Sequence, residues 1–292
     1  MPSLKDIRTR INSVKTTRQV TSAMKMVSAA KFKKAQDDIF HIRPYVDKLT
    51  GIIYDLTNSL DEEVDFAFSE KRDPNRVLIF VVTSNRGLCG AFNSNVIKET
   101  EKLIRTKFFA QLKNDSLHIV AVGKQGQKVL KMHDYTVVGD FNDFYSHPSF
   151  EEASNMAEMV MDSFLRKEYD RVLMVYNEFI NAAVHEVKTF QFLPLEIPFD
   201  EHFLHPVNYI FEPDKLTIIN KVIPKALKTI FYRILLESLA SEHGARMTSM
   251  HKATDNATHL LSELQLAYNK VRQGAITKEI LEIVGGAEAL KK

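Results

Sequence analysis

The last third of the chain, from about Tyr209 to Val284, has the pattern of one long helix. It holds two prolines, Pro213 near its start and Pro224, and two isolated glycines, and its apolar residues recur three and four positions apart. These apolar positions are Leu216, Ile219, Ile223, Leu227, Ile230, Ile234, Leu260, Leu264, Tyr268 and Val271. At 1.5 Å per residue the helix would be roughly 105 Å long, whereas a compact domain built from the middle of the chain is about 35 Å across. We therefore expect the helix to extend beyond that domain and to present its apolar stripe to a partner.

The first sixty residues have the same character. From Leu4 to Leu60 a seam of residues in alternating steps of three and four is mostly apolar, as in a coiled coil. The seam has a polar gap that consists of Arg18, Thr21, Lys25 and Ser28. Pro44 lies inside the pattern, which continues on both sides, so it is predicted to kink this helix rather than to end it.

The middle of the chain, about 74–195, changes to short apolar runs that alternate with helical patterns. Strands are predicted at 76–83, 118–122, 135–138, 172–176 and 184–192, and helices at 94–112 and 150–167. This order implies right-handed crossovers and a mostly parallel sheet, with the last, alternating run at an edge. We predict an N-terminal coiled-coil helix at 1–62, a Rossmann-like α/β domain at 74–195 and a C-terminal coiled-coil helix at 209–286.

The two long helices are the nearest partners for each other's apolar stripes. Both begin or end at the same α/β domain, so we expect an antiparallel coiled coil. If Leu60 lies near Tyr209, the numbers of paired residues should sum to roughly 270. The polar gap would then lie opposite 242–252, a stretch that is also polar and rich in small residues.

Composition excludes several classes of protein. The chain has 292 residues, 45% of them hydrophobic, and a formal net charge of +2, which predicts no general affinity for nucleic acid. Because no run of eighteen apolar residues and no apolar signal-peptide core occur, we expect neither a transmembrane span nor secretion. The lone Cys89 fits a reducing compartment, so the chain is expected in the cytosol or docked by partners on the cytosolic face of a membrane.

No constellation of residues for chemistry stands out. The loop 84–93 and the stretch 123–128 each follow a predicted strand, but neither matches a phosphate-binding motif, so their glycines are interpreted as tight turns and a helix N-cap. Cys89 is interpreted as a small buried thiol, and the scattered histidines lack metal-ligand spacing. We assign no catalytic residue, no cofactor and no metal.

The polar gap has two interpretations. Met24, Lys25 and Arg246 could simply face water, or they could form, with small neighbours, a surface that another protein grips and releases. The end of the C-terminal helix carries Arg272, Gln273 and Thr277 among apolar residues that need cover from outside the chain.

Three stretches resemble the gamma subunit of the F-type ATP synthase. They are residues 4–31, which begin LKDIRTRINSV; the loop RGLCGAFN at 86–93; and residues 241–277, which begin SEHGARM. The order and spacing of these motifs match over the whole chain, although residues 112–170 match only in their general pattern of residue types. Asn85 stands where the family usually has Asp, and Ser22 where Lys is usual, so a charge role at position 22 is not expected. The paired-cysteine insertion of chloroplast relatives is absent.

The resemblance implies a non-catalytic central rotor, present in one copy per complex. Its expected partners are the alpha and beta subunits, which form a hexamer ring, the epsilon subunit and the membrane ring of c subunits; it would lie on the cytoplasmic face of the inner (plasma) membrane, held there by those partners only. Carried over by motif, Met24, Lys25 and Arg246 would face the moving lever of the beta subunits. The resemblance implies a catch near the tip formed by Arg272, Gln273 and Thr277. It implies a foot against the c ring and epsilon formed by Tyr209, Phe211 and Glu212.

Two other interpretations remain open from the residues alone. An α/β enzyme with a coiled-coil dimerisation arm would bind nucleotide or substrate as an isolated chain. A structural coiled-coil scaffold would form a homodimer, whereas a rotor pairs its two helices within one chain.

Overall fold

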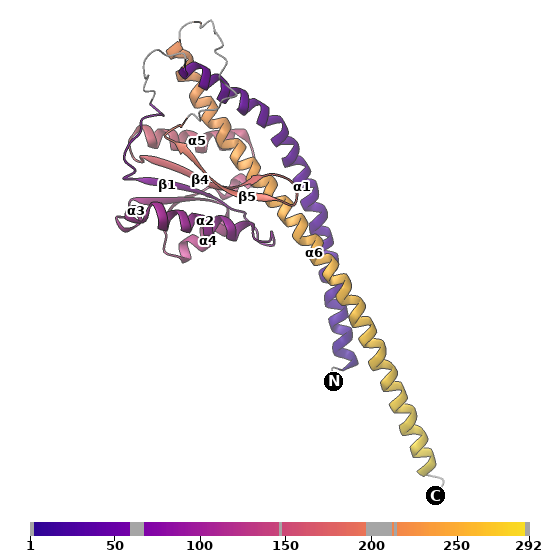
Figure 1. Ribbon diagram of the computed structural model, residues 1–292. Coiled ribbons are helices and arrows are strands. Elements are labelled where there is room, and N and C mark those ends of the chain that lie inside the picture. Colours follow the sequence, from indigo (N-terminus) through magenta and orange to yellow (C-terminus); the bar gives the residue numbers. More distant parts are fainter. Residues whose placement is uncertain (1–2, 59–66, 146–147, 197–211, 213–214, 290–292) are drawn as a thin grey trace. The chain divides into compact units, whose positions relative to one another are not determined.

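The computed structural model describes residues 3–58, 67–145, 148–196, 212 and 215–289 (Figure 1). Two helices dominate it: α1, Leu4–Asn58, and α6, Lys215–Ala289, which is 75 residues long. Ser3 and Asp6 cap the start of α1 reciprocally, each side chain accepting a hydrogen bond from the other residue's backbone amide at 3.2 Å. Helix α1 continues through Pro44, and α6 continues through Pro224.

The chain forms two compact units, and each long helix contributes to both. One unit comprises Ala29–Arg246, and the other comprises Met1–Ser28 together with Met247–Lys292. The three predicted domains follow changes of pattern along the sequence instead, and their boundaries stay a prediction.

The larger unit contains one five-stranded sheet in the order β3-β2-β1-β4-β5. The strands are β1, Val77–Val82; β2, Leu117–Val122; β3, Val137–Asp140; β4, Arg171–Phe179; and β5, His185–Leu193. All pairs are parallel except β4 with β5, so the predicted mostly parallel sheet with an antiparallel edge strand is confirmed.

Shorter helices connect these strands. They are α2, Phe92–Lys107; α3, Phe109–Lys113; α4, Lys124–Met132; a 3-10 turn, Asn142–Tyr145; and α5, Phe150–Leu165. The helix predicted at 94–112 is therefore divided at Phe108, and α4 was not predicted. Ser149 caps α5 by accepting a hydrogen bond from the Glu152 amide at 3.2 Å.

The sheet is buried on both faces, which explains the continuously apolar sequence of β1. Residues Val77, Ile79 and Val81 share one core with α2 and α4. Residues Leu78, Phe80 and Val82 face a second core, built with α5, α6 and the C-terminal part of α1. Figure 1 shows α2 and α4 on one side of the sheet and α5 on the other.

Within the larger unit, α1 and α6 pack antiparallel. Arg43 donates a hydrogen bond to the buried Glu237 at 3.1 Å, and one turn further along α1 Asp47 lies 3.8 Å from Arg233. The predicted seam faces this contact, because Phe32, Ala35, Ile39, Val46 and Ile53 are all buried. The predicted antiparallel coiled coil is therefore confirmed here.

The smaller unit pairs the start of α1 with the end of α6. The Thr254 hydroxyl donates to the Thr21 hydroxyl at 2.9 Å, so the predicted polar gap is a polar contact. Beside it lies a groove of about 400 Å³ lined by Arg18, Gln19, Ser22, Thr254 and Thr258. The numbers of this pair sum to 275, and those of the two ion pairs in the larger unit to 280, rather than to the predicted 270. The observed pairing is therefore offset from the prediction by one to three helical turns; the predicted anchor residues, Leu60 and Tyr209, lie outside the described residues.

Candidate functional site

The loop 84–93 follows the central strand β1 at the carboxyl edge of the sheet. Because β1 is flanked by β2 on one side and β4 on the other, this edge is where open α/β sheets usually bind a ligand. Here the loop contacts helix α6 of the same chain instead.

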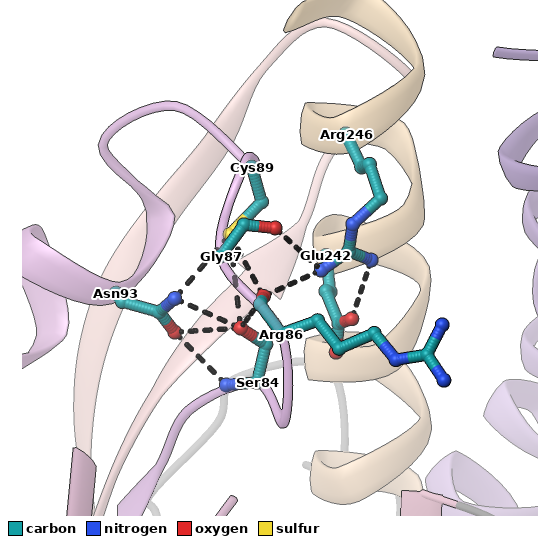
Figure 2. Close-up of polar contacts among 7 residues, drawn as sticks. All are labelled: Ser84, Arg86, Gly87, Cys89, Asn93, Glu242 and Arg246. Atoms are coloured by element: carbon teal, nitrogen blue, oxygen red, sulfur yellow. Dashed lines mark hydrogen bonds and ion pairs between the residues drawn. The ribbon is translucent and has the colours of Figure 1, made fainter. Parts of the chain in front are cut away.

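Arg246 makes that contact (Figure 2). Its guanidinium donates to the carbonyl of Arg86 at 2.8 Å, to the carbonyl of Gly87 at 3.4 Å and to the Glu242 carboxylate at 2.5 Å. The Arg246 and Glu242 residues are only 7% and 5% exposed. We call this set of contacts the Arg246 clasp; a buried, charge-assisted pair of this kind fixes geometry as well as contributing energy.

Hydrogen bonds within the loop fix the orientation of its carbonyl groups. Asn93 accepts from the Ser84 amide at 2.9 Å, and the Ser84 hydroxyl donates to the Arg86 carbonyl at 2.7 Å. Leu88 and Gly90 take left-handed backbone conformations, with φ of 64° and 61°. For Leu88 this conformation costs about 1 kcal/mol, which the surrounding bonds must offset.

Cys89 is part of this packing and is 1% exposed. Its thiol accepts a hydrogen bond from the Asn93 amide at 3.3 Å, and burial raises its pKa. A protonated, buried thiol is a poor nucleophile, so the interpretation of Cys89 as a packing residue is confirmed.

Two further contacts hold the same stretch of α6 against the sheet. The Ser241 hydroxyl donates to the Asn177 carbonyl on β4 at 3.3 Å. At Gly244 any Cβ would lie 2.8 Å from the carbonyl oxygen of Ala182, in the turn between β4 and β5, so this position requires glycine. Ser241, through its hydrogen bond, and Gly244, through its small size, therefore both allow the stretch 241–246 to pack closely against the sheet.

The charges of the clasp are unusual because they are buried. Burial raises the pKa of the Glu242 carboxyl, although the Arg246 guanidinium opposes that rise. Burial, together with the positive charges of Arg246 and Lys31, lowers the pKa of His243 to about 4. Both the Glu242 Oε2 and the His243 Nδ1 are buried atoms without a hydrogen-bond partner.

The backbone amides near the glycine-containing loops are committed to the chain's own acceptors. The Lys124 amide donates to Asn85 at 3.0 Å and the Gly126 amide to the Thr83 hydroxyl at 2.9 Å. Gly123 caps α4 with a φ of 102°, and a Cβ on Gly126 would lie 2.5 Å from that hydroxyl. The interpretation is confirmed for Gly123, the N-cap of α4, but is wrong for Gly126, which lies inside α4 where the Thr83 side chain leaves no room for a Cβ. Among the described residues, no three His, Cys, Asp or Glu side chains gather closely enough to hold a metal ion.

The residues predicted to contact partners are distributed over both units. Met24 and Lys25 are half-buried in the smaller unit, whereas the neighbouring Met26 and Val27 are 62% and 59% exposed. Arg246 belongs to the larger unit, where its guanidinium is occupied by the clasp. The exposed residues among the predicted set are Arg272, Gln273, Thr277 and Glu212. Tyr209 and Phe211 lie outside the described residues.

Sequence reasoning missed the partners of Arg246. Glu242 precedes it by four positions, which on a helix places opposite charges side by side, and this spacing could have indicated the pair. The carbonyls of Arg86 and Gly87 carry no signal in the sequence, because any residue has a carbonyl.

Comparison with known proteins agrees with this architecture. The family model described as ATP synthase matches residues 3–290. The ATP synthase gamma chain of Flavobacterium johnsoniae is 52% identical over 290 residues, which cover 99% of each chain. The ATP synthase gamma chain of Cytophaga hutchinsonii is 48% identical over 293 residues, again 99% of each.

Solved structures share the fold at lower identity. The rotor of the Euglena gracilis mitochondrial ATP synthase is 21% identical, with a TM-score of 0.64 over 94% of this chain and 98% of that one. A second Euglena gracilis structure, of OSCP, F1 and c-ring, contains a chain that is 21% identical, with a TM-score of 0.67 over 98% of this chain and 94% of that one. The chain thus shares the fold of these ATP synthase chains, an antiparallel helix pair joined to an α/β domain. The full-length similarity shows that the chain belongs to the family of ATP synthase gamma chains.

Proposed function

We propose that this chain is the central rotor shaft of an F-type ATP synthase, which couples proton-driven rotation of a c-ring to conformational cycling of a catalytic alpha/beta hexamer and performs no chemistry itself. The observation that carries the proposal is the 52% identity to a gamma chain over 99% of both sequences. The antiparallel pairing of α1 with α6 supports it, because a shaft made within one chain needs both ends of that chain.

The coupling follows from asymmetry. A single asymmetric shaft inside a threefold ring makes different contacts with each catalytic site. The three otherwise equal conformations of these sites therefore acquire different populations. Rotation exchanges these contacts among the sites, so that ion flow and ATP synthesis share one coupling free energy.

The proposed partners are the alpha and beta subunits, epsilon and the c-ring, with one copy of this chain per complex. The similar chains belong to a rotor and to an assembly of OSCP, F1 and c-ring, which supports this assignment. None of the described helices is long and apolar enough to cross a membrane. We propose that the partners alone hold the chain at a membrane, on its cytoplasmic face.

For contact with the beta subunits we propose the polar gap on α1. Met24 and Lys25 lie there half-buried, and the adjacent Met26 and Val27 expose large apolar side chains that would be covered by a partner. Arg246 would act from the larger unit through its clasp, which fixes the carbonyls of the loop 84–93 and hence the surface that this loop presents.

For the end of the shaft we propose that Arg272, Gln273 and Thr277 form a catch against the ring. All three side chains are exposed, and the Thr277 hydroxyl donates to the Gln273 carbonyl one turn earlier, at 3.0 Å. Tyr209, Phe211 and Glu212 are proposed for the foot against the c-ring and epsilon; Glu212 is exposed.

The experiment is to supply this chain as the only gamma chain of an assembled synthase and to measure proton-driven ATP synthesis in vesicles. The wild-type chain should support synthesis. Met24→Lys should uncouple proton flow from synthesis while the complex still assembles, because a charge is added to a surface that a partner grips. Met24→Leu, which keeps size and polarity, is the matched control and should remain coupled. Assembly without synthesis by the wild-type chain would contradict the proposal.

A further inference from the structure

A groove lies between the second half of α2 and the edge strand β5, on the face of the sheet that α2 covers. Leu173 on β4 pairs with Gln191 on β5, and Val175 pairs with Thr189. Side chains two residues apart on a strand share a face, so Arg171 and Leu173 point to the same side. Gln191 and Thr189 line this groove from β5, and α2 lines it from the other side.

The floor of the groove is apolar and its rim is basic. Leu103, Phe108 and Leu173 form the floor and are 7%, 4% and 6% exposed. The cations around it are Lys102, Lys107 and Arg171. The single acidic residue of the lining is Glu99, which lies 3.5 Å from Lys102 at a solvent-exposed position.

Two of these cations, Arg171 and Lys107, have no partner for their charge among the described residues. The Nε of Arg171 is a buried atom with no hydrogen-bond acceptor. Within the described part of the chain, neither Arg171 nor Lys107 forms an ion pair or a side-chain hydrogen bond. A guanidinium normally finds an acceptor when its atoms are buried, because an unpaired buried donor costs free energy. Arg171 also lines the groove, so an anion bound there would lie beside a positive charge that no carboxylate among the described residues neutralises.

The dimensions limit the ligand. The groove has a volume of about 390 Å³. That is near the lower end of the range of roughly 300 to 1,000 Å³ for small-molecule sites. A body of one or two rings with a single charged group therefore fits better than a large cofactor.

We propose that this groove binds an organic phosphate the size of a mononucleotide. Its phosphate group would accept hydrogen bonds from Arg171 and would be attracted by the positive charges of Lys102 and Lys107. Its apolar body would cover the floor at Leu103 and Leu173. The site uses none of the residues of the Arg246 clasp and does not depend on the proposed rotor function.

The test is isothermal titration calorimetry of the full-length chain with three probes at constant ionic strength: adenosine monophosphate, inorganic phosphate and adenosine. The monophosphate should bind most tightly, because it alone engages both the cations and the floor. Inorganic phosphate should bind more weakly, and adenosine should lose about tenfold or more in affinity, since a hydrogen bond to a charged group contributes about 1.5 to 3 kcal/mol.

Variants assign the binding to this groove. Arg171→Gln should weaken monophosphate binding by about 10-fold or more for the same reason. Arg105→Gln removes an exposed cation that lies outside the groove on α2, the helix that carries Lys102 and Lys107. It is the matched control and should change affinity less than about twofold. The double variant Lys102→Gln/Lys107→Gln alters only side chains at the rim of the groove. It should also weaken monophosphate binding, and it replaces Arg171→Gln in the test if that variant does not fold.

Three outcomes would overturn the proposal. One is no binding of the monophosphate up to about 10 mM, which is weaker than any useful affinity. Another is an equal loss in the Arg105→Gln control, which would mean diffuse attraction to a basic surface. The last is an unchanged affinity in the double lysine variant.

Discussion

The two halves of helix α6 differ in what they bury. In residues 215–246 charged and polar side chains are buried, among them Glu237, Ser241, Glu242 and Arg246, and most have partners within the chain. In residues 247–289 large apolar side chains are exposed instead: Leu266 is 72% exposed, Ile276 47% and Ile283 71%. The first half is therefore built for stability within its own unit, whereas the second half presents the surface that a partner must cover.

The largest expected effect in the first half is the removal of Arg246. Arg246→Ala leaves the Glu242 carboxylate buried without its ion-pair partner, and this should lower the free energy of unfolding by about 3 to 5 kcal/mol. The measurement is urea unfolding of the full-length chain, followed for the larger unit. The double variant Glu242→Gln/Arg246→Gln removes both charges at similar volume and should be less damaging than the single truncation. A loss below about 1 kcal/mol for Arg246→Ala would mean that the clasp is not a buried pair in solution.

The second prediction concerns pH. The pKa of His243 is about 4 in the folded chain, below its ordinary value of 6.5, because of burial and the charges of Arg246 and Lys31. A depressed pKa stabilises the fold above pH 6.5, and this contribution is lost as pH falls from 6.5 toward 4, by roughly 3 kcal/mol. The raised pKa of Glu242 acts in the opposite direction, because protonation of that carboxyl favours the folded state as pH falls.

The contribution of His243 is isolated by comparing unfolding free energies of the wild type and His243→Gln between pH 7 and pH 4. The wild type should lose more stability over this window than the variant, since only the wild type has the histidine to protonate on unfolding. Parallel pH profiles for the two proteins would contradict the depressed pKa.

The third prediction uses one glycine from each half of α6. Gly244→Ala places a Cβ 2.8 Å from the Ala182 carbonyl, so the turn between β4 and β5 must shift. This should cost about 1 to 3 kcal/mol of unfolding free energy. Gly274→Ala is the matched control, because nothing lies within 4 Å of its added Cβ. A helical Gly-to-Ala change in open space should stabilise by up to about 1 kcal/mol. Thermal unfolding of both variants measures the difference, and equal shifts would remove the distinction between the two halves.

The smallest effect on stability is expected at the exposed end of α6. The double variant Ile276→Ser/Ile280→Ser changes side chains that are 47% and 54% exposed. Stability of the isolated chain should change by less than about 0.5 kcal/mol. Binding to the alpha/beta ring should weaken clearly, because these apolar side chains would be covered in the complex. Unchanged assembly, measured by gel filtration of the mixed subunits, would show that the partner covers a different surface.

Strong local patterns made much of the fold predictable. The apolar run of β1 and the alternation of β5 identified a buried and an edge strand, and the three-four spacing of Phe32, Ala35 and Ile39 identified the buried seam of α1. Such periodicity is a consequence of burial on one face, so it survives in the sequence.

Other elements left a misleading signal. Helix α4 has nine residues and carries Gly126, which disfavours a helix by about 1 kcal/mol, so its sequence resembles a loop. The glycine is needed because the Thr83 side chain occupies the space of its Cβ. The same limit applies to the clasp, since the Arg246 guanidinium finds its backbone acceptor 160 residues away, a contact that no local pattern encodes.

The central claim is that this chain turns as a shaft, and single-molecule rotation tests it most directly. A bead would be attached through Lys98→Cys, an exposed position on α2, in a chain whose buried Cys89 is replaced by Ser, within an assembled alpha/beta ring fixed to a surface. On addition of ATP the account predicts unidirectional rotation with three dwell positions per turn, set by the threefold ring. A bead that stays fixed or only fluctuates, in complexes that hydrolyse ATP, would contradict it.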